Sequence, residues 1–172
     1  LPSKATPKVD IEDAYEVIRR LKIPESNWET IWIDGIVETF EKSLGELTRT
    51  ERGNLMARVR MIILHQRAYR HNGLVVGTGD KSELLIGYFT KHGDGAADFL
   101  PLGGLYKTQV KQLAAYLGVP EKILAKTPTA GLWPGQTDEG EIGLKYETLD
   151  LVLHGLVDLG LPSSQVAEML RL

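Results

Sequence analysis

The stretch "LVVGTGDKSE", residues Leu74 to Glu83, decides how we interpret the fold, because an apolar run ends there in a glycine-rich turn. In α/β proteins, ligands bind where buried strands end and the following helices begin, since backbone N–H groups are available at that edge. Thr78 lies between the two glycines of the turn, so its hydroxyl is free to meet an adenosine or a phosphate. The stretch therefore predicts a nucleotide site at the carboxyl end of a strand.

Two common nucleotide-binding motifs are incomplete here. Ser82 stands where the third glycine of the dinucleotide fingerprint G-x-G-x-x-G is required. The segments "GTGDKS" and "GGLYKT" carry Asp80 and Tyr106 where a Walker loop needs a glycine before its lysine. The chain therefore has neither a dinucleotide fingerprint nor a P-loop.

The periodicity of apolar residues alternates between strand and helix. The predicted helices cover residues 11–21 (capped by Asp10), 35–44 (capped by Asp34), 50–71, 107–117, 146–159 and 163–170 (capped by Ser163 or Ser164), with a short helix from Glu121. Strands are predicted at 28–33 and 74–76. This alternation predicts an α/β fold, a doubly wound parallel sheet with helices on both faces.

Two strands are too few to cover such long amphipathic helices. Residues 1–9 could form the tail of a third strand, and the chain does not begin with Met. We therefore expect the N-terminal strands of the sheet to be missing from this sequence. Residues 127–143 hold two prolines and four glycines without a steady period, which predicts a long functional loop.

The totals exclude several classes of protein. A length of 172 residues fits one domain, and a formal net charge of -3 gives no general attraction to nucleic acid or anionic lipid. The absence of cysteine rules out disulfides, thiolate metal sites and cysteine nucleophiles. No apolar run approaches the roughly 20 residues of a spanning helix. We expect a soluble cytoplasmic protein with neither a membrane nor a nucleic-acid partner.

Several polar residues are candidates for ligand binding. Glu83 lies one turn into the helix after the glycines, where a carboxylate could hold Mg²⁺ together with phosphate oxygens. Lys107 begins a predicted helix, a position that is unfavourable for a cation unless an anion lies there. Lys91 and Asp98 lie in the glycine-containing segment "TKHGDGAAD". For each of these residues, a solvent-exposed side chain without a ligand is the alternative.

Six segments taken together resemble the ammonia-dependent NAD synthetases, a family of ATP pyrophosphatases. They are "ARVRM" (57–61), "GTGDKSE" (77–83), "GYFTKHGDGAAD" (87–98), "PLGGLYKT" (101–108), "KTPTAGLWPGQTDE" (126–139) and "EIGLKYE" (141–147). The resemblance covers residues 10–158 and implies an adenine nucleotide alpha hydrolase-like fold. It also implies that ATP activates the nicotinate carboxylate of deamido-NAD as an adenylate, from which ammonia displaces AMP to give NAD.

The resemblance implies a role for particular residues. Those implied for ATP are Thr78, Lys107 and Thr129; those for deamido-NAD are Arg58, Lys91 and Asp98; Glu83 is implied for Mg²⁺; and Asp138 and Glu139, on the predicted covering loop, are the candidate catalytic residues. A homodimer is also implied, with Arg58 near the subunit contact. Free ammonia is the expected nitrogen source, because glutamine hydrolysis in the family needs a cysteine nucleophile and this chain has no cysteine.

The sequence departs from the family pattern in two places. The S-G-G-x-D-S loop that grips pyrophosphate and the C-terminal His-Lys segment are both absent. We therefore expect that the 172 residues alone do not turn over substrate. Two alternatives remain: an ATP pyrophosphatase that adenylates another acceptor, such as a nucleobase or a tRNA base, and a non-catalytic paralogue that binds nucleotide or dimerises.

Overall fold

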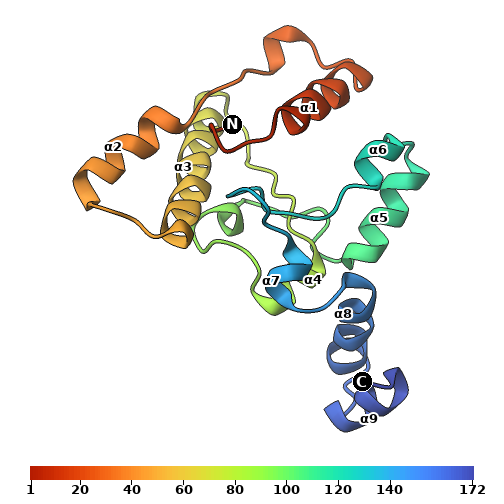
Figure 1. The fold of residues 1–172 in the computed structure, drawn as a ribbon. Helices are drawn as coiled ribbons and strands as arrows, with labels where there is room; N and C mark the ends of the chain where they lie inside the picture. Colours follow the sequence, from red (N-terminus) through yellow and green to blue (C-terminus); the bar gives the residue numbers. More distant parts are fainter. The chain divides into compact units, whose positions relative to one another are not determined.

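The computed structural model describes residues 1–172, which form two compact units (Figure 1). The first unit contains residues Leu1–Val75, Thr90–Ala96 and Thr129–Gln136. The second contains Val76–Phe89, Ala97–Pro128 and Thr137–Leu172. The chain thus crosses between the units several times, and each unit is described separately.

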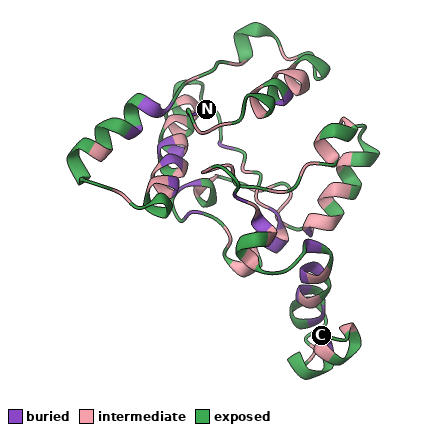
Figure 2. Ribbon diagram, in the orientation of Figure 1, coloured by how far each residue is buried: buried purple, intermediate pink, exposed green.

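Helix α3 provides most of the core of the first unit. This unit comprises α1 (Lys8–Arg20), the 3₁₀ turn η1 (Glu25–Asn27), α2 (Asp34–Leu44), α3 (Arg49–Arg70) and the 3₁₀ turn η2 (Asp94–Ala96). Met56 and Val59 of α3 pack against Ile33 and Val37 at the start of α2, and all four side chains are at most 1% exposed. Buried residues follow one side of α3 (Figure 2). An apolar stripe on an amphipathic helix therefore forms this core, as the sequence predicts.

Helix α8 has the same role in the second unit. This unit comprises α4 (Lys81–Ile86), α5 (Lys107–Tyr116), α6 (Glu121–Leu124), α7 (Asp138–Ile142), α8 (Tyr146–Leu153), the π-helical turn η3 (His154–Asp158) and α9 (Ser163–Leu170). Helix α8 contacts α4, α5 and α9. Its buried residues Tyr146, Leu149 and Leu153 pack with Tyr106, which immediately precedes α5. None of the helices is long and apolar enough to cross a membrane.

The sheet prediction is met at one position only. Val76 and Phe99 form an isolated parallel bridge, and the N–H of Gly77 donates to the carbonyl of Phe99 at 2.9 Å. Residues 28–33, predicted as a strand, form no bridge. The N–H of Ile33 donates to the carbonyl of Pro2, but no ladder of hydrogen bonds follows. An extended segment becomes a strand only when a neighbouring segment pairs with it. The side-chain pattern of the segment itself cannot show whether such a neighbour exists.

Prolines precede two helices whose predicted caps are wrong, while the predicted bounds of the second, residues 163–170, are confirmed. Helix α1 begins at Lys8 after Pro7, so Asp10 lies in its first turn instead of capping it. Helix α9 follows Pro162 and has no side-chain cap, so neither predicted serine caps it. The fixed φ of proline suits the extended residue before a helix.

Two further local predictions are also wrong. Asp34 is the first residue of α2, and its carboxylate accepts the N–H of Lys4 at 3.0 Å instead of capping the helix. Residues 127–143 are not all loop, because Thr137 caps the short helix α7 by accepting the N–H of Gly140 at 3.2 Å. A helix of five residues is too short to show a period in the sequence.

Gly77 is required by a close approach of two segments. A Cβ atom at this position would lie 2.4 Å from Cδ2 of Leu100 and 2.6 Å from Cβ of Ala97. The Leu100 side chain can rotate away, but the Ala97 methyl group moves only with its backbone. A Cβ atom at Gly79 would instead lie 3.6 Å from Leu100, an ordinary contact.

We expect Gly77→Ala to lower the free energy of unfolding by about 1–3 kcal/mol, because the added methyl group forces the segments around the Val76–Phe99 bridge apart. Gly79→Ala is the matched control and should change it by less than about 0.5 kcal/mol. Urea unfolding followed by circular dichroism measures both. Equal midpoints for the two variants would contradict the close approach at Gly77.

Candidate functional site

Lys107 is held between two carboxylates at the start of helices α4 and α5. Its Nζ lies 2.7 Å from Oδ2 of Asp80 and 2.7 Å from Oε1 of Glu83. Asp80 is the N-cap of α4 and Glu83 the third residue of that helix, and they form a reciprocal capping box. Oδ1 of Asp80 accepts the N–H of Glu83 and Oε2 of Glu83 accepts the N–H of Asp80, each at 3.0 Å. Each carboxylate therefore uses one oxygen for the helix cap and the other for Lys107.

This charge cluster is largely buried. The side chain of Asp80 is 1% exposed, and those of Lys107 and Glu83 are 17% and 19% exposed. Burial raises the pKa of Glu83 in spite of the hydrogen bond from Lys107. Burial alone would lower the pKa of Lys107, but its hydrogen bonds to Asp80 and Glu83 outweigh this and raise it. The ammonium thus stays charged in a site that also holds two carboxylates.

Two tyrosines bring α7 next to this cluster. Nζ of Lys107 lies 5.1 Å from the ring centroid of the fully buried Tyr146. The Tyr146 hydroxyl donates to Oδ2 of Asp138 at 3.3 Å, and the Tyr88 hydroxyl donates to Oδ1 at 3.3 Å. Burial and the nearby carboxylates raise the pKa of both phenols, so they remain donors. Oε1 of Glu139 accepts the N–H of Tyr146 at 3.0 Å.

The structure therefore places both candidate catalytic carboxylates at the start of α7. Asp138 is 3% exposed, and Glu139 is partly buried. Their hydrogen bonds fix the position of Tyr146, and through its ring they reach Lys107. Tyr146 thus lies between these carboxylates and the Lys107 ammonium.

Two more predicted residues of the second unit flank the parallel bridge. Thr78 is exposed in the glycine turn that follows Val76, and Asp98 is exposed immediately before Phe99. The bridge between Val76 and Phe99 brings these two segments side by side. Thr78 lies on the first of them, which leads to Asp80, and Asp98 lies on the second.

The remaining three predicted residues lie in the first unit. Arg58 is exposed on α3, and its Nε donates to the carbonyl of Lys91 at 3.1 Å. The structure thus brings Arg58 next to the turn that carries Lys91, which is also exposed. Thr129 is exposed, and its Oγ1 accepts the N–H of Gly131 at 3.1 Å. Two adjacent exposed cations are suited to an anionic ligand.

The sequence interpretation missed Asp80 and Asp150. From the sequence alone, Asp80 is assigned no role beyond interrupting a Walker loop, although the spacing D-x-x-E before an apolar run is the signal of a capping box. Asp150, on α8, is 4% exposed and accepts hydrogen bonds from Ser82 and Thr108. A carboxylate among the apolar positions of an amphipathic helix would have been the signal for Asp150.

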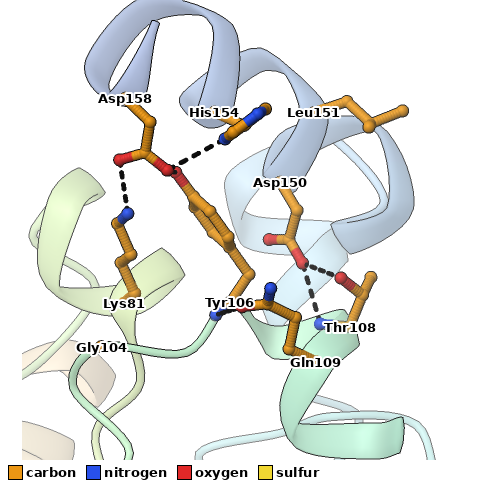
Figure 3. Close-up of a pocket in the computed structure, with 9 residues that line it drawn as sticks. All are labelled: Lys81, Gly104, Tyr106, Thr108, Gln109, Asp150, Leu151, His154 and Asp158. Atoms are coloured by element: carbon orange, nitrogen blue, oxygen red, sulfur yellow. Dashed lines mark hydrogen bonds and ion pairs between the residues drawn. The ribbon is translucent and has the colours of Figure 1, made fainter.

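A pocket of about 320 Å³ opens beside these helix starts (Figure 3). It is lined by Lys81, Tyr106, Thr108, Gln109, Asp150, His154 and Asp158, among others. Asp158 receives hydrogen bonds from Lys81 at 2.5 Å and from Tyr106 at 2.9 Å, and these donors lower its pKa. The structure has no cluster of three or more histidines or carboxylates that could hold a metal ion by themselves.

Comparison with known proteins agrees with the resemblance seen in the six sequence segments. The family described as NAD synthase matches residues 1–172. The NH(3)-dependent NAD(+) synthetase of Sulfolobus acidocaldarius is 53% identical over 154 residues, which cover 90% of this chain and 55% of the relative. This chain thus spans less than two thirds of that relative's length.

Solved structures agree as well. The NMN synthetase from Francisella tularensis is 41% identical with a TM-score of 0.84, covering 99% of this chain and 69% of that one. The NH3-dependent NAD synthetase from Campylobacter jejuni, in complex with the nitrate ion, is 31% identical with a TM-score of 0.74, covering 99% of this chain and 68% of that one. With a family match over its whole length and relatives at this identity, the chain belongs to the NAD synthase family.

Proposed function

We propose that the protein carrying this chain amidates the nicotinate carboxylate of deamido-NAD with ammonia. The carboxylate attacks the α-phosphate of ATP and releases pyrophosphate, and ammonia then displaces AMP from the adenylate to give NAD. The observation that carries the proposal is the buried Lys107 ammonium beside Asp80 and Glu83, next to the glycine turn. Negative charge moves onto the leaving pyrophosphate in the first step, and a fixed cation stabilises it there.

We propose that Thr78, Lys107 and Thr129 bind ATP and that Glu83 binds Mg²⁺. The residues fit a divalent cation, because Asp80 and Glu83 already hold a positive charge at 2.7 Å from each carboxylate. Mg²⁺ needs only one or two protein carboxylates when phosphate oxygens and water complete its shell. When bound, it would neutralise phosphate charge. The Lys107 ammonium, held at the first residue of α5, would bind a phosphate oxygen.

Arg58, Lys91 and Asp98 are the proposed contacts of deamido-NAD, since two cations suit its pyrophosphate and a carboxylate suits a ribose hydroxyl or amine. Asp138 and Glu139 are the proposed catalytic carboxylates. Ammonium must lose a proton before it can attack the adenylate, and a carboxylate next to the site can accept that proton. Both carboxylates accept hydrogen bonds from Tyr146, whose ring faces the Lys107 ammonium, and this supports the proposal.

The Francisella structure favours one second candidate, in which the acid substrate is the mononucleotide instead of the dinucleotide. The chemistry at the carboxylate would be unchanged, and only the contacts to the distal part of the substrate would differ. The relatives named as NAD synthetases are more similar in sequence, which favours deamido-NAD. An ATP pyrophosphatase for an unrelated acceptor has no such support.

The reaction itself is the first test. The full-length protein, with ATP, Mg²⁺, ammonium and deamido-NAD, should form NAD and AMP in equal amounts, and chelation of the metal should stop this. Chromatography of the products measures both nucleotides. Faster turnover of nicotinic acid mononucleotide would support the second candidate. If AMP forms with neither deamido-NAD nor nicotinic acid mononucleotide as the acid substrate, both candidates are contradicted.

Lys107→Ala should lower kcat/KM for ATP by about 10²–10³-fold, because the fixed charge that meets the phosphates is lost. Lys111→Ala is the matched control: it lies on the same helix, is 37% exposed and contacts Glu147 only at 3.9 Å. Steady-state kinetics with both variants, at a temperature where circular dichroism shows both folded, measures the effect. Equal losses in the two variants would contradict a role for Lys107 in binding ATP.

We also propose that the protein is a homodimer, as the family resemblance implies, with Arg58 near the subunit contact. Arg58 is exposed on α3, and so are the apolar residues Ile62 and Leu64 of the same helix. Contacts at this helix would bury them, which is favourable. Light scattering should therefore give the mass of a dimer, and a monomeric mass at micromolar concentration would contradict the proposal.

A further inference from the structure

Asp150 joins the first turns of two helices through a single carboxylate. Its Oδ1 accepts the hydroxyl of Ser82, in α4, at 2.5 Å. Its Oδ2 accepts the N–H of Thr108, in α5, at 2.8 Å and the hydroxyl of the same residue at 2.7 Å (Figure 3). Both oxygens are therefore occupied, and Asp150 is 4% exposed.

The residues that Asp150 contacts are neighbours of the two residues proposed to meet ATP and its metal. Ser82 directly precedes Glu83, and Thr108 directly follows Lys107. A further hydrogen bond closes the arrangement, because the N–H of Lys107 donates to Oγ of Ser82 at 2.9 Å. Asp150 thus binds the hydroxyl of the residue before Glu83 and the N–H and hydroxyl of the residue after Lys107, without touching the ion pair itself.

The hydrogen-bond directions favour a carboxylate at this position. Ser82 Oγ already accepts the N–H of Lys107, so its single proton is directed to Asp150. Thr108 presents an N–H and a hydroxyl to the other oxygen. Asp150 therefore accepts three hydrogen bonds and donates none. An asparagine would present an NH₂ group to a donor on one side, and the first turn of α5 would lose a negative charge that favours its N-terminus.

Other contacts also join the starts of α4 and α5, but they do not involve Asp150. The N–H of Lys81 donates to the carbonyl of Leu105 at 2.8 Å. Asp158 binds Lys81, which precedes Ser82, and Tyr106, which precedes Lys107. These contacts keep the two segments together without Asp150. Among the three, only Asp150 binds Ser82, which precedes Glu83, and Thr108, which follows Lys107.

We propose that Asp150 is a positioning residue for the reaction, which sets the placement of Glu83 and Lys107 relative to each other. This inference rests on the proposed function. A shift of the order of 1 Å in a group that contacts the transition state can cost about 10²-fold in rate. The cost should appear in kcat and in the KM for ATP, because the residues that bind deamido-NAD are not joined to Asp150.

The test compares Asp150→Asn with Glu147→Gln in the full-length protein. Both replace a carboxylate by an amide on α8, but the side chain of Glu147 is 64% exposed and its nearest cation lies 3.9 Å away. Asp150→Asn should lower kcat about 10²-fold and leave the KM for deamido-NAD nearly unchanged. Glu147→Gln should behave as the wild type. Kinetics are measured at a temperature where circular dichroism shows every variant folded.

The pocket beside Asp150 allows a second measurement. Asp150→Ala leaves a space for a carboxylate that opens into the 320 Å³ pocket. Added formate should therefore restore part of kcat in Asp150→Ala and none in Lys107→Ala. Thr108→Ala and Thr108→Ser provide a milder pair if the Asp150 variants do not fold: only the alanine removes the hydroxyl donor, so only it should slow the reaction.

The outcomes separate this inference from the proposed function. An active wild type together with an equally active Asp150→Asn overturns the positioning role alone. So does an equal rate for the two Thr108 variants, or a loss in Asp150→Asn confined to the KM for deamido-NAD. A wild type that forms no NAD and no AMP overturns the proposed function, and with it this inference.

Discussion

The buried ion pair of Lys107 with Asp80 and Glu83 is the interaction on which the second unit depends. Two negative charges and one positive charge lie almost out of contact with solvent, and their desolvation is costly unless every polar atom has a partner. The capping box supplies those partners on α4, and the ring of Tyr146 faces the ammonium. Because replacement of a buried ion pair by apolar residues is often neutral or stabilising, stability alone does not explain why such a cluster exists. The proposed exchange of this ion pair with ATP and its metal would explain it.

The helices were predictable from the sequence because their determinants are local. The apolar stripe of α3 and its capping box of Thr48 and Glu51 lie within one segment, and the structure agrees with the prediction to within about two residues. Residues 28–33 show the limit. Their alternation is typical of a strand, but a strand also requires a neighbour to accept its hydrogen bonds. Pairing is a property of distant segments and cannot be derived from the pattern of one.

The candidate site was predictable to a similar degree. The resemblance selected Glu83 and Lys107 by motif, and the structure places their charged atoms 2.7 Å apart. Asp80 was overlooked because its cap function and its charge function occupy the same residue. Asp150 was overlooked because its partners are 42 and 68 residues away. Short-range spacing identifies groups that act on one turn of a helix, whereas carboxylates that join separate helices become visible only in three dimensions.

The π-helical turn after α8 explains how two carboxylates of one helix serve the same pocket. Asp150 and Asp158 are eight residues apart, and in an uninterrupted α-helix that spacing would rotate them by roughly 80° from each other. The turn His154–Asp158 has more residues per turn, with the N–H of Leu159 donating to the carbonyl of His154 at 3.0 Å. This reduces the rotation, so that both side chains line one pocket and reach the starts of α4 and α5. A π-turn costs hydrogen-bond geometry, and π-turns are frequent at functional sites. Here it allows a single helix to hold both segments that carry the buried ion pair.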